Sequence, residues 1–286
     1  MIGDVSFYVG SDSADTWSYR EMFQMDEEGN ADYVAAAIPD RFSDVGQVWG
    51  NPLYNWSVME ADGFSWWKRR AAHSRKLFDV VRIDHFSGFV KNYMVPAEAG
   101  SVFGGRWLKA PGRKLTEALN SELEGCTVIA DDSVGKALVP GVKKLLGKTG
   151  WLGTRVLMFA FDGNTVDENL PHNYTDGHLA VYAGTHDDET IVGYFQDKTE
   201  QELAYLYKYL NINSKEQIPD ALIRCAYSST ADIAIIQMQD VLQLGNEARM
   251  NAPATVGCNW RWRLNNEPLD ESRRAWIRNL AAVYRR

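Results

Sequence analysis

The stretch Asp79–Phe86, which reads DVVRIDHF, joins a short β-branched run to a carboxylate. The run is nearly continuous in apolar residues, as expected of a parallel strand that is buried on both faces. Five further runs share this form, and each is followed closely by an aspartate. The six runs are Val5–Val9, Asp79–Ile83, Thr127–Ala130, Arg155–Phe161, His178–Ala183 and Ile233–Met238, and their aspartates are Asp12, Asp84, Asp131, Asp162, Asp187 and Asp240.

Amphipathic helical stretches lie between most of these runs. Pro111, Pro140 and Pro219 stand near helix starts, where the missing N–H costs nothing. The alternation of strands and helices predicts βαβ crossovers and a parallel sheet. The predicted helices are Gly63–Leu77, Pro111–Leu123, Pro140–Leu146, Thr199–Leu210, Ile218–Ser228 and Pro268–Arg286.

Two α/β architectures fit this alternation. A doubly wound sheet gathers its functional groups at one switch point with a glycine-rich phosphate turn, and no GxGxxG follows any run. A TIM-type (β/α)8 barrel places functional side chains at the carboxyl ends of many strands, as the six aspartates do here. The pattern therefore favours a barrel. Since such a barrel needs eight strands and six runs are visible, we expect an N-terminally truncated barrel.

One partial barrel domain is expected over residues 1–286. Residues 21–56 are rich in Gly, Pro, Asp and aromatic residues, and they are interpreted as a long active-site loop insertion rather than as two missing strands.

Composition excludes several kinds of partner. The net charge is -8 and no long Lys/Arg tract occurs, so a nucleic-acid or anionic-membrane partner is not expected. The three cysteines are widely spaced and form no CxxC pair, which indicates reduced thiols. The first residues lack the pattern of a signal peptide. We therefore expect a cytoplasmic protein.

Arg82 and Asp84 form the sharpest local signal. Alternate strand residues point the same way, so the two side chains are expected to share a face. The guanidinium would keep Asp84 ionised, as a nucleophile requires. A structural Arg–Asp pair fits the motif equally well.

Asp131 and Asp187 extend this carboxylate set. Retaining glycoside cleavage needs a nucleophile and a protonated acid about 5–5.5 Å apart, which adjacent barrel strands can supply. A third carboxylate, with His186 beside it, can stabilise an oxocarbenium-like transition state. Each acid taken singly also fits a helix N-cap.

Other chemistries lack their motifs. The sequence contains no GxSxG, no HExxH and no GxxxxGK[ST], which argues against a serine hydrolase, a zincin and a P-loop enzyme. The five histidines are scattered. We expect neither a metal site nor a cofactor.

Seven ordered segments resemble motifs of the 4-α-glucanotransferases, the amylomaltase or disproportionating-enzyme family (glycoside hydrolase family seventy-seven). The resemblance runs from about residue 2 to 264. Its segments are Gly3–Trp17, Ile38–Trp56, Arg82–Gly88, Leu170–Tyr174, Gly184–Asp187, Glu247–Asn251 and Asn259–Leu264.

The resemblance implies transfer of α-1,4-glucan segments between maltooligosaccharides by a retaining double displacement, in starch, glycogen or maltodextrin metabolism. It makes Asp84 the nucleophile, Asp131 the general acid/base position and Asp187 the transition-state stabiliser. It also implies substrate contacts by Arg82, His186, Asp40, Phe42, Trp49, Tyr54 and Asn251.

The sequence departs from the family pattern at three places. The family has a glutamate where this chain has Asp131, and the turn Ser133–Gly135 has an extra residue. Asp188 stands where the family usually has asparagine, which adds a negative charge beside Asp187. The family also has about two further strands before Gly3. A non-catalytic glucan-binding remnant and an α-glucan hydrolase therefore stay open as alternatives.

Overall fold

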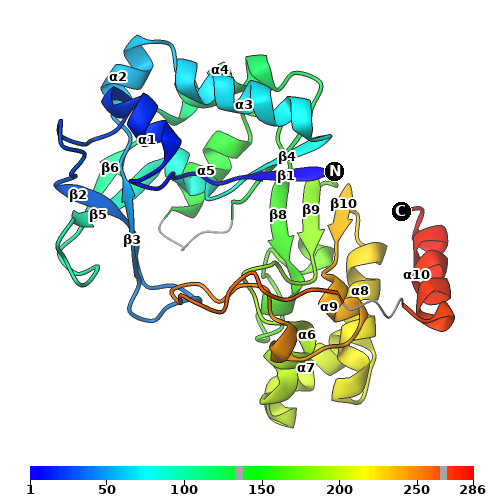
Figure 1. Ribbon diagram of the computed structural model, residues 1–286. Coiled ribbons are helices and arrows are strands. Elements are labelled where there is room, and N and C mark those ends of the chain that lie inside the picture. The colour runs from blue at the N-terminus through cyan, green and yellow to red at the C-terminus, as the bar shows by residue number, and fades with distance from the viewer. Residues whose placement is uncertain (133–137, 265–268) are drawn as a thin grey trace. The chain divides into compact units, whose positions relative to one another are not determined.

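The computed structural model describes residues 1–132, 138–264 and 269–286. These residues form two compact units, Met1–Gly153 and Thr154–Arg286, which we call the N-terminal and C-terminal units (Figure 1). Each unit contains a strand set and a buried apolar cluster of its own.

A parallel sheet lies at the centre of the N-terminal unit. Its strands are β1 (Ile2–Val5), β4 (Val80–Ile83) and β7 (Thr127–Ala130), in the order β1-β4-β7. Val81, Ile129 and Ala130 have no exposed surface, as the continuous apolar runs predict. The pairing extends past the strand ends, because the N–H of Asp84 donates to the Val5 carbonyl at 3.0 Å. Asp131 likewise donates to the Ile83 carbonyl at 3.0 Å.

Helices cover this parallel sheet. Helices α3 (Ser65–Leu77) and α4 (Gly112–Glu122) pack side by side, and α3 contacts β1 and β4 (Figure 1). The apolar faces of these helices are buried, as their periodicity predicts. The other helical elements are α1 (Ala14–Ser18), η1 (Arg20–Met22), α2 (Trp56–Ala61), η2 (Phe86–Phe89) and α5 (Val139–Leu146).

A second, antiparallel sheet occupies the segment that was expected to be a loop. Its strands are β2 (Tyr33–Ala37), β3 (Gln47–Pro52), β5 (Lys91–Pro96) and β6 (Arg106–Lys109), in the order β3-β2-β5-β6. Residues 21–56 therefore contain two strands, and β5 and β6 were not predicted at all. All four are short, and β3 and β6 are mostly exposed, so the strands gain their stability by pairing with one another.

The C-terminal unit contains β8 (Gly153–Val156), which begins one residue before the unit boundary, with β9 (Leu179–Tyr182) and β10 (Ile233–Ile235). The order is β10-β9-β8, and β9 and β10 run parallel. Its helical elements are η3 (Leu157–Phe159), η4 (Pro171–Asn173), α6 (Ile191–Gln196), α7 (Glu200–Leu210), η5 (Lys215–Gln217), α8 (Ile218–Ser228), α9 (Met238–Val241), η6 (Asn246–Ala248) and α10 (Glu271–Tyr284).

Three strands differ from their predicted bounds by more than one residue at an end. Strand β1 spans Ile2–Val5 instead of Val5–Val9, because its partner β4 ends opposite Val5 and the chain then leaves the sheet. The runs predicted from Arg155 and from Ile233 stop early and continue as the helical elements η3 and α9. A short apolar run alone does not distinguish a buried strand from a buried helical turn.

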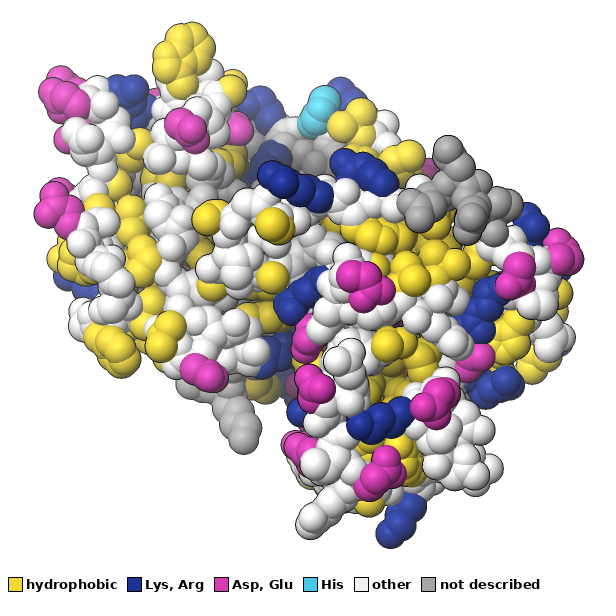
Figure 2. All heavy atoms as spheres, turned by 60° about the horizontal axis from the view of Figure 1, so that its bottom comes forward, with side chains coloured by type: hydrophobic (Ala, Val, Ile, Leu, Met, Phe, Trp, Pro, Cys, Tyr) yellow, Lys and Arg dark blue, Asp and Glu magenta, His cyan; other side chains and the backbone are white. Residues whose placement is uncertain are grey.

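The surface carries charges of both signs. On the face in Figure 2, acidic and basic side chains are interspersed. Among the described residues, every helix is too short or too polar to cross a membrane.

Candidate functional site

Arg82 gathers three carboxylates in the N-terminal unit. Its Nη1 donates to Asp4 Oδ1 at 2.7 Å and to Asp84 Oδ1 at 3.1 Å. Its Nη2 donates to Asp131 Oδ2 at 2.9 Å. The guanidinium is almost completely buried, while the three carboxylates keep part of their surface exposed. We call these four residues the arginine cluster.

Strand register builds the arginine cluster. Asp4 and Arg82 are directly paired across β1 and β4, and Asp84 lies two residues beyond Arg82 on the same face. Asp131 follows β7 directly, and its backbone pairs with the end of β4. Three neighbouring parallel strands therefore supply one acid each, all within reach of one side chain.

Charge and burial act in opposite directions on this cluster. Burial disfavours the charged form of Arg82, but the three carboxylates outweigh it and raise the pKa of the guanidinium. Burial raises the pKa of Asp131 although Arg82 lowers it, and the charge of Asp84 adds to the rise. A carboxyl with a raised pKa is suited to carry the proton of a general acid.

His85 follows Asp84 in the left-handed backbone region, with φ 47°. Few residues with a side chain adopt this region, and such strain clusters at functional sites. The imidazole lies 5.1 Å from the Trp49 ring and 5.8 Å from the Phe7 ring, measured between centroids. Burial lowers the pKa of His85 against the charge of Asp84 and of other nearby carboxylates, which favours the neutral imidazole.

Trp49 and Tyr54 have different environments. Trp49 on β3 is partly exposed and packs against His85, so the structure brings it next to the arginine cluster. Tyr54 has no exposed surface, and its hydroxyl donates to the carbonyl of Phe7. A side chain without exposed surface does not contact a glucan directly, so Tyr54 supports the site from within the core.

Asp40 and Phe42 lie in the turn before β3. The Oδ1 of Asp40 accepts from the N–H of Phe42 at 2.8 Å and from that of Ser43 at 3.1 Å, which closes the turn. The guanidinium carbon of Arg41 lies 4.8 Å from the centre of the partly exposed Phe42 ring. Charge on Asp40 and on Arg41 also influences the pKa of His85 and of Asp131 respectively.

Asp187 has its own set of partners in the C-terminal unit. Its Oδ1 accepts from the Asn251 amide at 2.6 Å, and its Oδ2 lies 3.4 Å from Nε2 of His186. Arg249 donates to the backbone carbonyl of Asp187 at 2.8 Å and to that of Asn251, also at 2.8 Å. The sequence-predicted residues Asp187, His186 and Asn251 thus lie together, and we call them the Asp187 group.

An aromatic ring borders the Asp187 group. The half-exposed Trp260 ring lies 5.2 Å from the His186 ring, centroid to centroid. Its backbone N–H donates to the Met250 carbonyl at 2.7 Å, next to Asn251. An exposed aromatic face beside polar groups suits a sugar ring.

Two buried aspartates lie behind the loop that carries Asp187. Asp188 accepts from the N–H and the hydroxyl of Thr185 at 2.8 and 2.7 Å, which closes the turn around His186 and Asp187. Asp240 has no exposed surface and accepts from the N–H of Ile191 at 2.7 Å. Burial raises the pKa of Asp240 to about 7, and the charge of Asp188 contributes to the rise.

The sequence prediction assigned no role to Asp4, Arg249 or Trp260. Asp4 was missed because β1 was predicted three residues too late, although it directly opposes Arg82. A run read from residue 2 would have shown an acid inside a strand, which is unusual enough to mark a site.

Two further expectations from the sequence concern the turn after Asp131 and a metal site. The turn Ser133–Gly135 after Asp131 lies outside the described ranges. Among the described residues, no group of three or more His, Cys, Asp or Glu is arranged to hold a metal ion.

Comparison with known proteins gives consistent matches. Residues 1–269 match the family profile described as 4-alpha-glucanotransferase. A 4-alpha-glucanotransferase of Thermus thermophilus is 41% identical over 292 residues, and the match covers 100% of this chain and 58% of that protein. A chloroplastic/amyloplastic 4-alpha-glucanotransferase of Solanum tuberosum is 41% identical over 290 residues, covering 100% of this chain and 50% of its own length.

A solved structure extends the similarity to three dimensions. The amylomaltase from Streptococcus agalactiae in complex with acarbose superimposes with a TM-score of 0.91 at 35% identity. The match covers 100% of this chain and 57% of that chain. The chain thus spans between about half and three fifths of the length of these relatives.

Proposed function

Since this chain belongs to the 4-alpha-glucanotransferase family, we propose that it transfers α-1,4-linked glucan segments between maltooligosaccharides. The observation that carries the proposal is the arginine cluster. One buried guanidinium binds both Asp84 and Asp131, so the two carboxylates lie close to each other. This arrangement is compatible with the separation of about 5–5.5 Å that retaining enzymes use.

The proposed reaction proceeds in two displacements. Asp84 attacks the anomeric carbon, Asp131 protonates the leaving glucan oxygen, and the donor segment becomes covalently bound to Asp84. Asp131 then removes the proton from the 4-hydroxyl of a second glucan, whose oxygen displaces Asp84. Asp187 stabilises positive charge that develops on the sugar ring, and Asn251 and His186 hold its carboxylate in place.

Substrate contacts are proposed for the partly exposed residues. Trp49 and Phe42 offer ring faces to sugars, while Arg82, His186, Asp40 and Asn251 offer polar groups. Tyr54 is reassigned to a positioning role, because its ring packs beneath Tyr8 and its hydroxyl holds the backbone at Phe7. The substrates are linear α-1,4-glucans, with no nucleic acid, membrane, metal or cofactor in the proposal.

We propose a TIM-type barrel as the fold class, six strands of which the sequence predicts. Eight strands close such a barrel. The chain spans 58% of the Thermus relative, so we assign the other two strands to a part of the family fold that these residues do not include. The three free cysteines are consistent with a cytoplasmic location.

A product analysis tests the function. Incubation with maltotriose is expected to give glucose together with maltodextrins longer than the substrate. Glucose and maltose alone would instead identify a hydrolase. Retained glucan binding without turnover would identify a non-catalytic remnant, an alternative that rests on the aspartate at position 131 and on the expected truncation of the barrel.

A further inference from the structure

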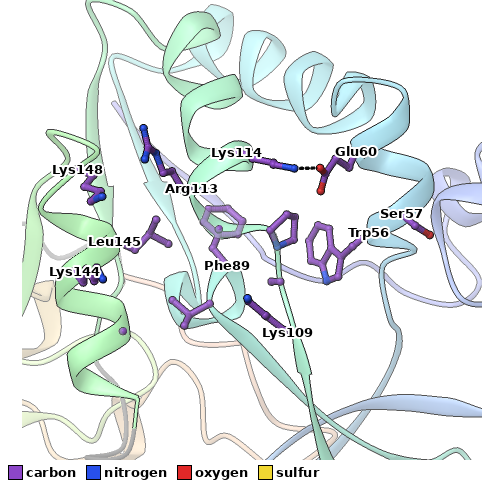
Figure 3. Close-up of a pocket in the computed structure, with 15 residues that line it drawn as sticks. Trp56, Ser57, Glu60, Phe89, Lys109, Arg113, Lys114, Lys144, Leu145 and Lys148 are labelled. Atoms are coloured by element: carbon purple, nitrogen blue, oxygen red, sulfur yellow. Dashed lines mark hydrogen bonds and ion pairs between the residues drawn. The ribbon is translucent and has the colours of Figure 1, made fainter.

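A basic pocket lies in the N-terminal unit, apart from the arginine cluster. Its volume is about 700 Å³, within the range of roughly 300–1,000 Å³ that small-molecule sites occupy. Figure 3 shows that its walls come from helices α2, α4 and α5 and from the residues that follow β6. None of the four residues of the arginine cluster lines it.

The charged side chains around the pocket are mostly cationic. Five basic residues and one acid line it, although the whole chain has a net charge of -8. Lys114 pairs with Glu60, and Arg113 pairs with Glu117 at 2.7 Å. In the part of the chain that the structure describes, the other three lysines have no carboxylate within salt-bridge distance; they are Lys109, Lys144 and Lys148.

Most of the remaining lining is apolar. Trp56 and Leu145 are almost completely buried but keep some exposed surface, whereas the Phe89 side chain has none, so Trp56 forms the aromatic floor of the pocket. The Trp56 indole N–H donates to Asn92 Oδ1 at 3.2 Å, which fixes the ring orientation. In Figure 3, Lys144 and Lys148 lie on one side of the pocket, and Trp56 lies on the other side next to Glu60. A ligand here would meet the two lysines on one side and the exposed part of Trp56 on the other.

Charge and shape together select a class of ligand. Three lysines without carboxylate partners favour an anion with several oxygen acceptors, because charge-assisted hydrogen bonds are the strong ones. The aromatic floor favours a planar or apolar portion on the same molecule. Helix α4 also begins at the pocket with Pro111 as an N-cap that makes no side-chain bond, so its partial positive charge adds to the lysines.

We propose that this pocket binds a phosphorylated small molecule with a ring system, of the size of a nucleoside diphosphate. The phosphates contact Lys144 and Lys148, and the base or other ring lies against Trp56. Binding at this site is independent of glucan transfer.

Calorimetric titration of the whole chain tests the site directly. Adenosine diphosphate and inorganic pyrophosphate are the probes, without any glucan present. We expect adenosine diphosphate to bind with a dissociation constant below about 1 mM. The double variant Lys144→Glu/Lys148→Glu is expected to weaken it at least about tenfold. The control Lys76→Glu/Lys208→Glu makes the same charge change at exposed lysines that do not line the pocket and should leave binding unchanged.

Three results would overturn the proposal. One is the absence of saturable binding of adenosine diphosphate. Another is an equal loss in the two double variants, which would show attraction to overall charge alone. The third is equal affinity for the two probes, because contact with the aromatic floor should favour adenosine diphosphate by about fivefold.

Discussion

The two candidate carboxylate groups, one in each unit, are held by different means. In the arginine cluster, one buried cation binds three carboxylates, so opposite charges hold the groups together. In the Asp187 group, the carboxylate contacts an amide and an imidazole, and the nearby Arg249 binds backbone carbonyls. The first arrangement controls protonation, whereas the second fixes the position of an acceptor.

This difference matches the chemistry that is proposed for each group. A nucleophile and an acid/base must hold different protonation states a short distance apart. A cation shared by two carboxyl groups that are buried to different degrees suits this requirement. A stabilising carboxylate has to stay oriented, which hydrogen-bond donors on fixed side chains achieve. The comparison therefore predicts that the two groups respond differently to matched substitutions.

Replacing the shared cation should cause the largest loss. Arg82→Lys keeps the charge but loses the fork that reaches both Asp84 and Asp131, so the transfer rate should fall by about 10²–10³-fold. Initial rates with maltotriose measure the effect, and circular dichroism checks that the variant is folded. A rate within about twofold of the unchanged protein would contradict the assigned geometry.

The matched neutral variant Arg82→Gln adds a pH test. Arg82 lowers the pKa of Asp131, so its removal should raise that pKa further. A general acid stays protonated up to its pKa, and the high-pH limb of the rate profile should therefore move to higher pH. A purely structural role of Arg82 would lower the rate at all pH values without moving this limb.

Substitutions at Asn251 test the Asp187 group. Asn251→Ala removes one donor to Asp187 and should cost about tenfold in rate, while Asn251→Asp should cost about 10²-fold. Asn251→Asp should cost more because it replaces the amide donor with a second carboxylate, which repels Asp187. Initial rates of both variants with maltotriose provide the measurement. An equal loss in both would show that Asn251 acts by shape alone.

Lengthening the acid should increase activity. Asp131→Glu restores the methylene that the family pattern has, and a misplacement of about 1 Å costs about 10²-fold, so a rise of about tenfold is expected. The rate with maltotriose measures it, and Asp132→Glu serves as the neighbouring control. Unchanged or lower activity at position 131 would remove Asp131 from the acid/base role.

The smallest effect on catalysis is expected at Asp240, which should instead change stability. The folded-state pKa of Asp240 is about 7 and lies above the usual value of about 3.9. The stability that Asp240 contributes is therefore fully present below about pH 4 and is lost as the pH rises through 7. Between pH 5 and pH 8 the protein should lose about 3 kcal/mol of unfolding free energy from this group.

Asp240→Asn should remove this loss, because the amide carries no charge at either pH and still accepts from Ile191. Urea unfolding at pH 5 and pH 8 measures the difference. Asp197→Asn, at an exposed residue of the same unit, is the matched control. An equal pH dependence in Asp240→Asn and the unchanged protein would contradict the raised pKa.

Local pattern predicted the regular elements of this fold well. Strand β7 and helix α8 have their predicted bounds, because each combines a clear periodicity with distinct end signals. The alternation that placed Arg82 and Asp84 on one face is confirmed by their 3.1 Å contact. These features depend on residues close together in the sequence.

Features that depend on distant pairing could not be read in the same way. The antiparallel sheet joins β2 and β3 to β5 and β6, and its strands are too short to be recognised before pairing. Asp4 belongs to the site only because the register of β1 with β4 places it opposite Arg82. The burial of Tyr54 likewise results from packing against Phe7 and Trp67, which local sequence does not show.

We propose that Asp84 becomes covalently linked to the donor sugar, and this intermediate can be trapped. α-Maltotriosyl fluoride needs no acid to release its leaving group, whereas the second displacement needs a base, so Asp131→Ala should accumulate the glycosylated chain. Mass spectrometry should show the chain with one added maltotriosyl group, located on the peptide that contains Asp84. Release of fluoride without an adduct, or an adduct on another carboxylate, would contradict the account.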